Sequence, residues 1–199
     1  PEARTGDVAV RVVWRDVPVA ARTSPGSTAC GTSRAPQVTP TTTWGIPEVL
    51  VTLEGGAPSG AAARVRYADC AVTPRLVTGS SLVVESADSR PARLALRAHD
   101  GESARPIQLP VAGHSVAVPL VAGTIYELAP VRGAADSAWI VAGPGAVTDR
   151  SGVASLRDVP PGTYGVRAWL PPGGGQPARE AQGQITVGAG ELAELTLEL

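Results

Sequence analysis

The sequence of 199 residues contains no Lys, Asn, Phe or Met. All 17 basic side chains are therefore Arg, a bias typical of a GC-rich genome, and without Asn there is no N-glycosylation sequon. The arginines are scattered and the net charge is −1, which argues against a surface for nucleic acid or anionic lipid. No apolar run approaches the ~18 residues of a membrane span. These absences predict a globular protein without a transmembrane segment.

Cysteine is nearly absent as well, because Cys30 and Cys70 are the only two. Unpaired core cysteines are one interpretation. We favour a disulfide, which would close a loop of about 40 residues and stabilise the fold by roughly 3–4 kcal/mol. A disulfide indicates an oxidising compartment: the periplasm, the cell surface or the extracellular space. The missing initiator Met fits either an incomplete chain or a mature chain whose signal peptide has been removed.

Helical periodicity is hard to find in this chain. Short β-branched runs recur instead, separated by Gly, Pro, Ser and Asp, and alternation is clear in Val8–Val12 and Leu94–Arg97. Half-buried strands of this kind are typical of antiparallel sheets in a sandwich or barrel. The predicted strands are Asp7–Trp14, Glu48–Leu53, Ala63–Tyr67, Arg75–Val77, Ser81–Glu85, Ala92–Ala98, Ile107–Pro110, Ser115–Leu120, Ile125–Ala129, Ala138–Val141, Val153–Leu156, Gly162–Trp169, Glu180–Val187 and Leu192–Leu199.

The last third of the chain carries two turn motifs. Asp149–Gly152 predicts a tight turn in which Gly takes a positive φ, and Asp158–Gly162 predicts a second turn set by its prolines. Tyr164 then opens a strand on which its ring can pack. The motifs Thr-Asp-x-x-Gly and Asp-Val-Pro-Pro-Gly-Thr-Tyr make this segment resemble the carboxypeptidase-regulatory-like, transthyretin-type β module of exported bacterial proteins.

Upstream, the order of features is similar to that of plastocyanin-like (cupredoxin) periplasmic proteins of the methylamine-utilisation-like group. The features are Cys30-Gly31, Val49–Gly55, Cys70-Ala71-Val72-Thr73-Pro74, Gly79 before a strand, Tyr126, and Ala138-Trp139-Ile140-Val141. In that group, a cupredoxin sandwich runs directly into the same C-terminal module. The resemblance implies an all-β fold with a cupredoxin-like Greek-key sandwich over 1–143 and a small transthyretin-like module over 144–199.

The resemblance also implies a copper site, whose ligands are missing from this chain. A mononuclear blue-copper site needs two imidazoles, a thiolate and a weak axial group such as Met. The ligand positions of the family fall near Ala92, Pro130, Gly133 and Asp136. None of them is Cys, His or Met, and only Asp136 has an oxygen to offer. We therefore expect no metal and no other cofactor.

No other catalytic or metal-binding constellation replaces that site. His99 and His114 stand at strand ends beside Asp or Gly, as solvated histidines do, and lack a third ligand at metal-binding spacing. Ser115 adjoins His114, but adjacent strand residues face opposite sides, which argues against a hydrolase. The carboxylates of Asp136, Asp149 and Asp158 come without a calcium-binding loop. The sequence thus indicates a protein that is not an enzyme.

Among the four tryptophans, Trp44 stands out. Trp139 and Trp169 lie within strand patterns and are predicted to be core residues, whereas Trp44 lies in a Thr-rich loop before Gly45. Trp44 is therefore the one candidate for an exposed ring and a ligand contact.

These observations favour a non-catalytic structural or protein-interaction domain of the bacterial cell envelope or of an extracellular assembly. Its expected partners are other envelope or extracellular proteins. Two alternatives stay open: an extracellular carbohydrate-binding module that uses Trp44, and a periplasmic redox or copper-handling protein with an unexpected site.

Overall fold

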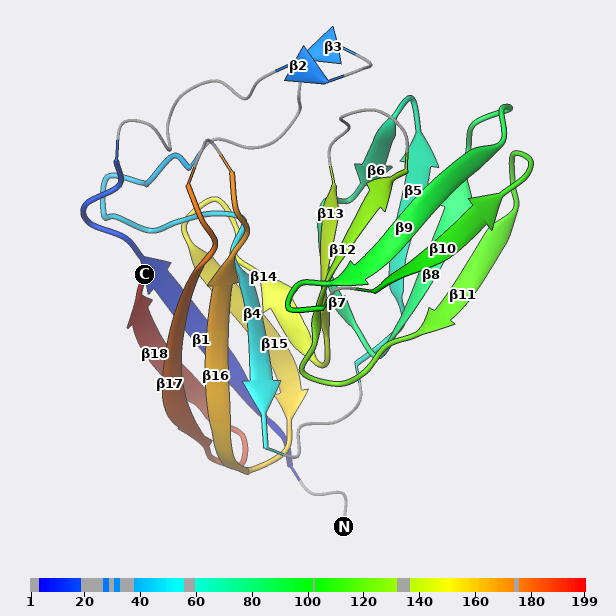
Figure 1. Ribbon diagram of the computed structural model, residues 1–199. Helices are drawn as coiled ribbons and strands as arrows, with labels where there is room; N and C mark the ends of the chain where they lie inside the picture. Colours follow the sequence, from blue (N-terminus) through cyan, green and yellow to red (C-terminus); the bar gives the residue numbers. More distant parts are fainter. Residues whose placement is uncertain are drawn as a thin grey trace. The chain divides into compact units, whose positions relative to one another are not determined.

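The computed structural model describes residues 4–18, 27–28, 31–32, 38–55, 60–101, 103–131, 137–173 and 176–199. Over these residues every regular element is a β-strand and none is a helix (Figure 1). The all-β prediction is therefore confirmed. None of these segments forms a helix with the length and apolarity needed to cross a membrane.

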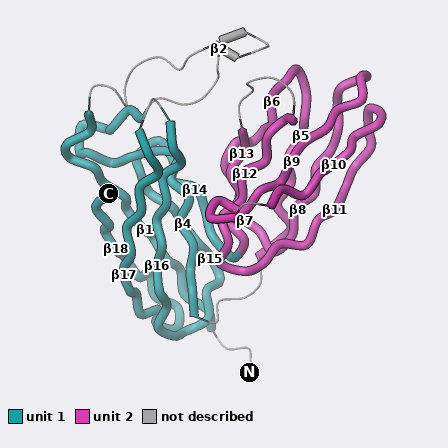
Figure 2. The backbone as a smooth tube through the Cα atoms, in the orientation of Figure 1, with its two compact units in different colours: residues 1–24, 36–59, 143–199 teal, residues 25–35, 60–142 magenta. Residues whose placement is uncertain are grey.

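The strands form two compact units, shown in different colours in Figure 2. Unit 1 comprises residues 1–24, 36–59 and 143–199, and unit 2 comprises residues 25–35 and 60–142. The strands of unit 1 are β1 (Gly6–Val13), β4 (Leu50–Glu54), β14 (Gly145–Val147), β15 (Val153–Val159), β16 (Gly162–Leu170), β17 (Arg179–Val187) and β18 (Leu192–Glu198). They make one sheet in the order β15-β1-β18 and another in the order β14-β4-β16-β17.

Unit 1 combines the two ends of the chain, which differs from the predicted division into 1–143 and 144–199. β1 lies between β15 and β18, and β4 lies between β14 and β16. The expected break near Gly143 is present, but a second break near Gly60 makes residues 60–142 an insertion between β4 and β14. Two strands of the expected N-terminal sandwich thus belong to the C-terminal module.

The core of unit 1 explains why the chain ends combine. Val8, Val10 and Val12 alternate along β1 and are at most 1% exposed. They share one hydrophobic cluster with Val166 and Ala168 of β16. Burying a valine side chain contributes about 1.5 kcal/mol or more, so without β1 the C-terminal strands would lose much of their apolar partner surface.

Unit 2 has nine strands in two sheets. They are β5 (Ala63–Ala68), β6 (Ala71–Thr73), β7 (Leu76–Gly79), β8 (Ser81–Ser86), β9 (Ala92–Ala98), β10 (Ala104–Leu109), β11 (Ser115–Pro119), β12 (Ile125–Pro130) and β13 (Ala138–Ala142). The sheet orders are β10-β9-β12-β13-β7 and β11-β8-β5-β6. The buried side chains of both sheets, among them Leu82, Leu94 and Ile140, form one cluster of their own. Two further strands, β2 (Ser27–Thr28) and β3 (Gly31–Thr32), pair with each other.

Every predicted strand overlaps an observed one, but the pairing is more varied than predicted. β1 runs parallel to β18, β5 parallel to β8, and β7 parallel to β13. Each of these pairs joins strands that are not neighbours in sequence, so alternation alone did not reveal their direction. The unpredicted strands β2, β3, β6 and β14 have two or three residues each and are too short for a periodic signal. The stretch Ala20–Thr43 is rich in Ser, Thr, Pro and Gly, which predicts a loop, and much of it lies outside the described residues.

Thr148 links the two parts of unit 1 through buried hydrogen bonds. The Thr148 side chain is buried. Its Oγ1 donates to the carbonyl oxygen of Ile46 at 2.8 Å and accepts from the N–H of Val49 at 2.9 Å. The backbone N–H of Thr148 also donates to the Val49 carbonyl. One hydroxyl therefore satisfies a donor and an acceptor about a hundred positions away in sequence.

Replacing Thr148 with Val is expected to lower the free energy of unfolding by about 2–6 kcal/mol, because two buried backbone groups lose their partner at about 1–3 kcal/mol each. Urea denaturation followed by circular dichroism measures the change. Thr163→Val is the matched control: the Thr163 hydroxyl faces only the exposed Thr186 hydroxyl, at 3.1 Å. The control should shift stability by less than about 0.5 kcal/mol. Equal losses in the two variants would contradict the role given to Thr148.

Candidate functional site

The turn between β5 and β6 places Asp69 and Cys70 at one end of unit 2. Ala68 pairs with Ala71, so the hairpin has two loop residues, and both have a positive φ, 49° at Asp69 and 60° at Cys70. This is the type I′ geometry that most often uses Asn-Gly. Cys70 is disulfide-bonded. Cys30 lies outside the described residues, so the Cys30–Cys70 pairing stays a prediction.

Two adjoining hollows open next to this turn, and they share Tyr67, Pro91 and Ala92. One has a volume of about 550 Å³ and the other of about 530 Å³. We call the two hollows together the end pocket. The larger is completed by Arg93, Pro130 and Val131, and the smaller by Asp69, Cys70, Asp88, Ser89 and Arg90.

The end pocket brings together two positions that the cupredoxin resemblance assigns to copper ligands. Ala92, at the start of β9, and Pro130, at the end of β12, line the same hollow. A methyl group and a pyrrolidine ring have no lone pair to donate to a metal. The other two predicted positions, Gly133 and Asp136, lie outside the described residues. The positions described at this end are thus close together and carry no metal-binding group.

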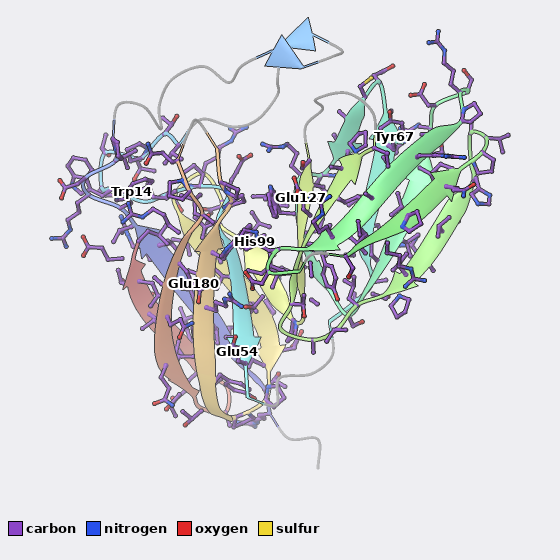
Figure 3. The ribbon with its side chains drawn as sticks, viewed as in Figure 1. Trp14, Glu54, Tyr67, His99, Glu127 and Glu180 are labelled. Atoms are coloured by element: carbon purple, nitrogen blue, oxygen red, sulfur yellow. The ribbon has the colours of Figure 1, made fainter. Side chains whose placement is uncertain are left out.

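Tyr67 is the main polar aromatic group of the end pocket, and Figure 3 labels it. It is 8% exposed, and burial raises the pKa of its phenol, with the Asp88 carboxylate adding to the rise. The hydroxyl therefore stays protonated at neutral pH and is available as a hydrogen-bond donor. The Tyr67 carbonyl accepts from the N–H of Ala87 at 2.9 Å, which fixes the strand end against the β8–β9 connection.

The two histidines lie in loops of unit 2. His99 follows β9, and its exposed ring meets Trp139 edge-on, with ring centres 5.6 Å apart. His114 is exposed before β11, and its carbonyl accepts from the N–H of Ser86. Ser115 is the first residue of β11 and pairs with Glu85. Within the described ranges, no group of three or more His, Cys, Asp or Glu side chains is placed to hold a metal ion.

The carboxylate of Asp149 accepts hydrogen bonds within a turn of unit 1, whereas Asp158 lies in β15 and bonds to the N-terminal segment. Asp149 Oδ1 accepts from the hydroxyl of Ser151 at 2.6 Å and from the N–H groups of Ser151 and Val153. These bonds, the hydroxyl first, hold the pKa of Asp149 below its ordinary value. Asp158 accepts from the Thr5 hydroxyl. Asp136, the third carboxylate considered as a calcium ligand, lies outside the described residues.

Trp44 lies in unit 1 and is 45% exposed, whereas Trp139 and Trp169 are 6% and 3% exposed. The interpretation of Trp139 and Trp169 as buried residues is confirmed. The backbone at Trp44 has a φ of 64°, which the sequence did not predict. Trp44 thus belongs to unit 1, whereas the residues of the end pocket belong to unit 2.

Sequence reasoning missed Tyr67, Arg93 and Val131 as pocket residues. Tyr67 stands within an alternating strand pattern and looked like an ordinary core residue. Arg93 and Val131 had no motif, and only their nearness to the counted positions Ala92 and Pro130 could have indicated them.

Comparisons with family models, with curated proteins and with solved structures found no match for this chain. The family resemblances therefore stay predictions that rest on the quoted motifs.

Proposed function

We propose that this protein is a non-catalytic interaction domain of the bacterial cell envelope or of an extracellular assembly, and that the end pocket receives a segment of a partner protein. One observation carries the proposal: Ala92 and Pro130 line a single open pocket and offer no metal ligand. A β scaffold of the cupredoxin type would then keep the shape of this end but use it to bind a partner protein instead of a copper ion.

The strand order of unit 2 supports the cupredoxin part of this proposal. Its two sheets have four and five strands, and each contains one parallel pair, β5 with β8 and β7 with β13. A two-sheet sandwich with mixed pairing of this kind is compatible with a cupredoxin-type scaffold. Function still has to be argued from the site, because a fold alone does not fix it.

The lining of the end pocket suits a protein segment better than a small anion or cation. Pro91, Pro130 and Val131 supply apolar contact area, and Val131 is 56% exposed. Arg93 stands on the larger hollow, and Asp88 on the smaller one. Charges of both signs beside these apolar side chains give a partner specificity and orientation.

The cysteine chemistry supports the proposed location. A disulfide-bonded Cys70 fits an oxidising compartment, and structural disulfides are rare in the cytosol. We accordingly propose the periplasm, the cell surface or the extracellular space.

Affinity capture from the envelope and secreted fractions of the source organism tests the proposal. A specific partner should be retained by the wild type and reduced at least tenfold by Val131→Asp, which places a charge in the pocket lining. Val111→Asp is the matched control, because Val111 is 57% exposed but lines neither hollow. Equal capture by both variants, or no captured partner, would contradict the proposal. A stoichiometric coloured complex on titration with Cu(II) would favour the copper-handling alternative instead.

A further inference from the structure

Trp44 is the only aromatic side chain among the large apolar residues that stand exposed in the described part of the chain. The other exposed large apolar residues are three valines of unit 2 and Leu192. Burial of an indole is strongly favourable, and the other three tryptophans are at most 6% exposed. An exposed indole on a sandwich surface therefore needs an explanation.

The backbone adds a second, independent observation. A φ of 64° at a bulky residue costs roughly 1–2 kcal/mol. The turn holds this conformation by hydrogen bonds from the N–H of Trp44 to the Thr41 carbonyl at 3.0 Å and from the N–H of Gly45 to Thr41 Oγ1 at 2.9 Å. The Trp44 carbonyl accepts from the N–H of Trp14 at 3.0 Å. The indole is thus presented from a fixed turn, where strain of this kind often marks ligand contacts.

Polar side chains lie beside this turn on the outer face of the sheet β15-β1-β18. Arg11 Nη2 donates to the Thr43 carbonyl at 3.0 Å and to the Thr43 hydroxyl, which fixes the turn to β1. Val8, Val10 and Val12 face the core, so Ala9 and Arg11 lie on the opposite face. Their register partners on that face are Ser155 and Glu194 for Ala9, and Val153 and Thr196 for Arg11. We call Ala9, Arg11 and their polar partners Ser155, Glu194 and Thr196 the outer-face patch.

The outer-face patch has the chemistry that recognises a neutral polyhydroxyl ligand. Arg11 and Glu194 balance in charge, while Ser155 and Thr196 add hydroxyl groups that donate or accept. An apolar sugar face can stack on the indole while the sugar hydroxyls bind these groups. Ala9 lies two strand positions, about 7 Å, from Arg11, so the whole patch is longer than one sugar ring.

We propose that Trp44 and the outer-face patch bind a neutral oligosaccharide chain. This binding is additional to the proposed partner pocket, which lies in unit 2 and uses other residues. A protein segment could also contact an exposed tryptophan, but the hydroxyl groups of Ser155 and Thr196 between the opposite charges of Arg11 and Glu194 favour the sugar.

Isothermal titration of the full chain with hexasaccharides of cellulose, xylan, starch and chitin tests the proposal. At least one should bind the wild type, and Trp44→Gly should weaken it tenfold or more. Gly adopts a φ of 64° without strain, which offsets part of the packing lost with the half-buried indole, so this variant should remain folded. Trp44→Tyr should keep part of the affinity, and Thr196→Val should weaken it several-fold.

Val131→Asp is the control that separates the two proposals, because it should leave oligosaccharide binding unchanged. Absence of binding by all four oligosaccharides, or equal binding by wild type and Trp44→Gly, would overturn the inference. The inference would also be overturned if Trp44→Gly abolished the capture of a partner protein but left oligosaccharide binding unchanged. If Trp44→Gly melts well below the wild type, the decision passes to Trp44→Tyr, and full loss of binding in a Trp44→Tyr variant that melts like the wild type would contradict stacking.

Discussion

Residues 144–199 expressed alone are expected to be unfolded, whereas residues 60–142 expressed alone are expected to fold. The shorter fragment keeps β14 to β18 but loses β1 and β4, which are interior strands of the two sheets of unit 1. β15 and β18 would then lose β1, the strand that pairs with both of them, and β14 would lose its only partner in the sheet order, β4. The core would lose Val8, Val10, Val12, Val51 and Leu53.

The longer fragment keeps the nine strands of the two large sheets of unit 2 and the complete hydrophobic cluster, and lacks only β2 and β3. Its Cys70 should be changed to Ser so that fragments do not cross-link. Far-UV circular dichroism and urea denaturation should show a cooperative transition for residues 60–142 and none for residues 144–199. The whole chain provides the folded reference. A cooperative transition in residues 144–199 would instead support the division at residue 143.

The local pattern of the sequence predicted the strands but not their partners. Alternation in Val8–Val12 marks a strand with one buried face, and nothing in those residues says that β15 and β18 are its neighbours. That pairing depends on which other strands of the chain have an apolar face that can be buried in the same core. Thr148 shows the same limit, because its hydrogen bonds to Ile46 and Val49 span the whole inserted unit.

The candidate sites were predictable to different degrees. Ala92 and Pro130 were located by counting from the motifs behind the cupredoxin resemblance, and both residues line one pocket. Tyr67 was invisible because a buried strand residue and a pocket residue have the same sequence pattern. The exposure of Trp44 followed from its Thr-rich loop, but its left-handed backbone depends on the Thr41 hydrogen bonds and had no local signal.

Gly152→Ala is expected to destabilise the protein by about 3–5 kcal/mol, because two separate costs add. Gly152 has a φ of 82°, and a Cβ there would lie 2.6 Å from Gly45 Cα and from the Ile46 nitrogen. These neighbours are backbone atoms held in place by hydrogen bonds of Val12, whose N–H donates to the Gly152 carbonyl at 2.9 Å and whose carbonyl accepts from Ile46. Neither segment can move aside without losing those bonds.

Gly190→Ala, in the same unit, measures the cost of backbone strain without the cost of a steric clash. Gly190 has a φ of 73° and an added Cβ would meet nothing within 4 Å, so only backbone strain of roughly 1–2 kcal/mol applies. Urea denaturation should therefore show a loss at Gly152 at least twice that at Gly190, and similar losses would refute the close crossing of the two turns. Because Gly45 adjoins Trp44, Gly152→Ala should also weaken oligosaccharide binding under conditions in which the variant remains folded, whereas Gly190→Ala should not.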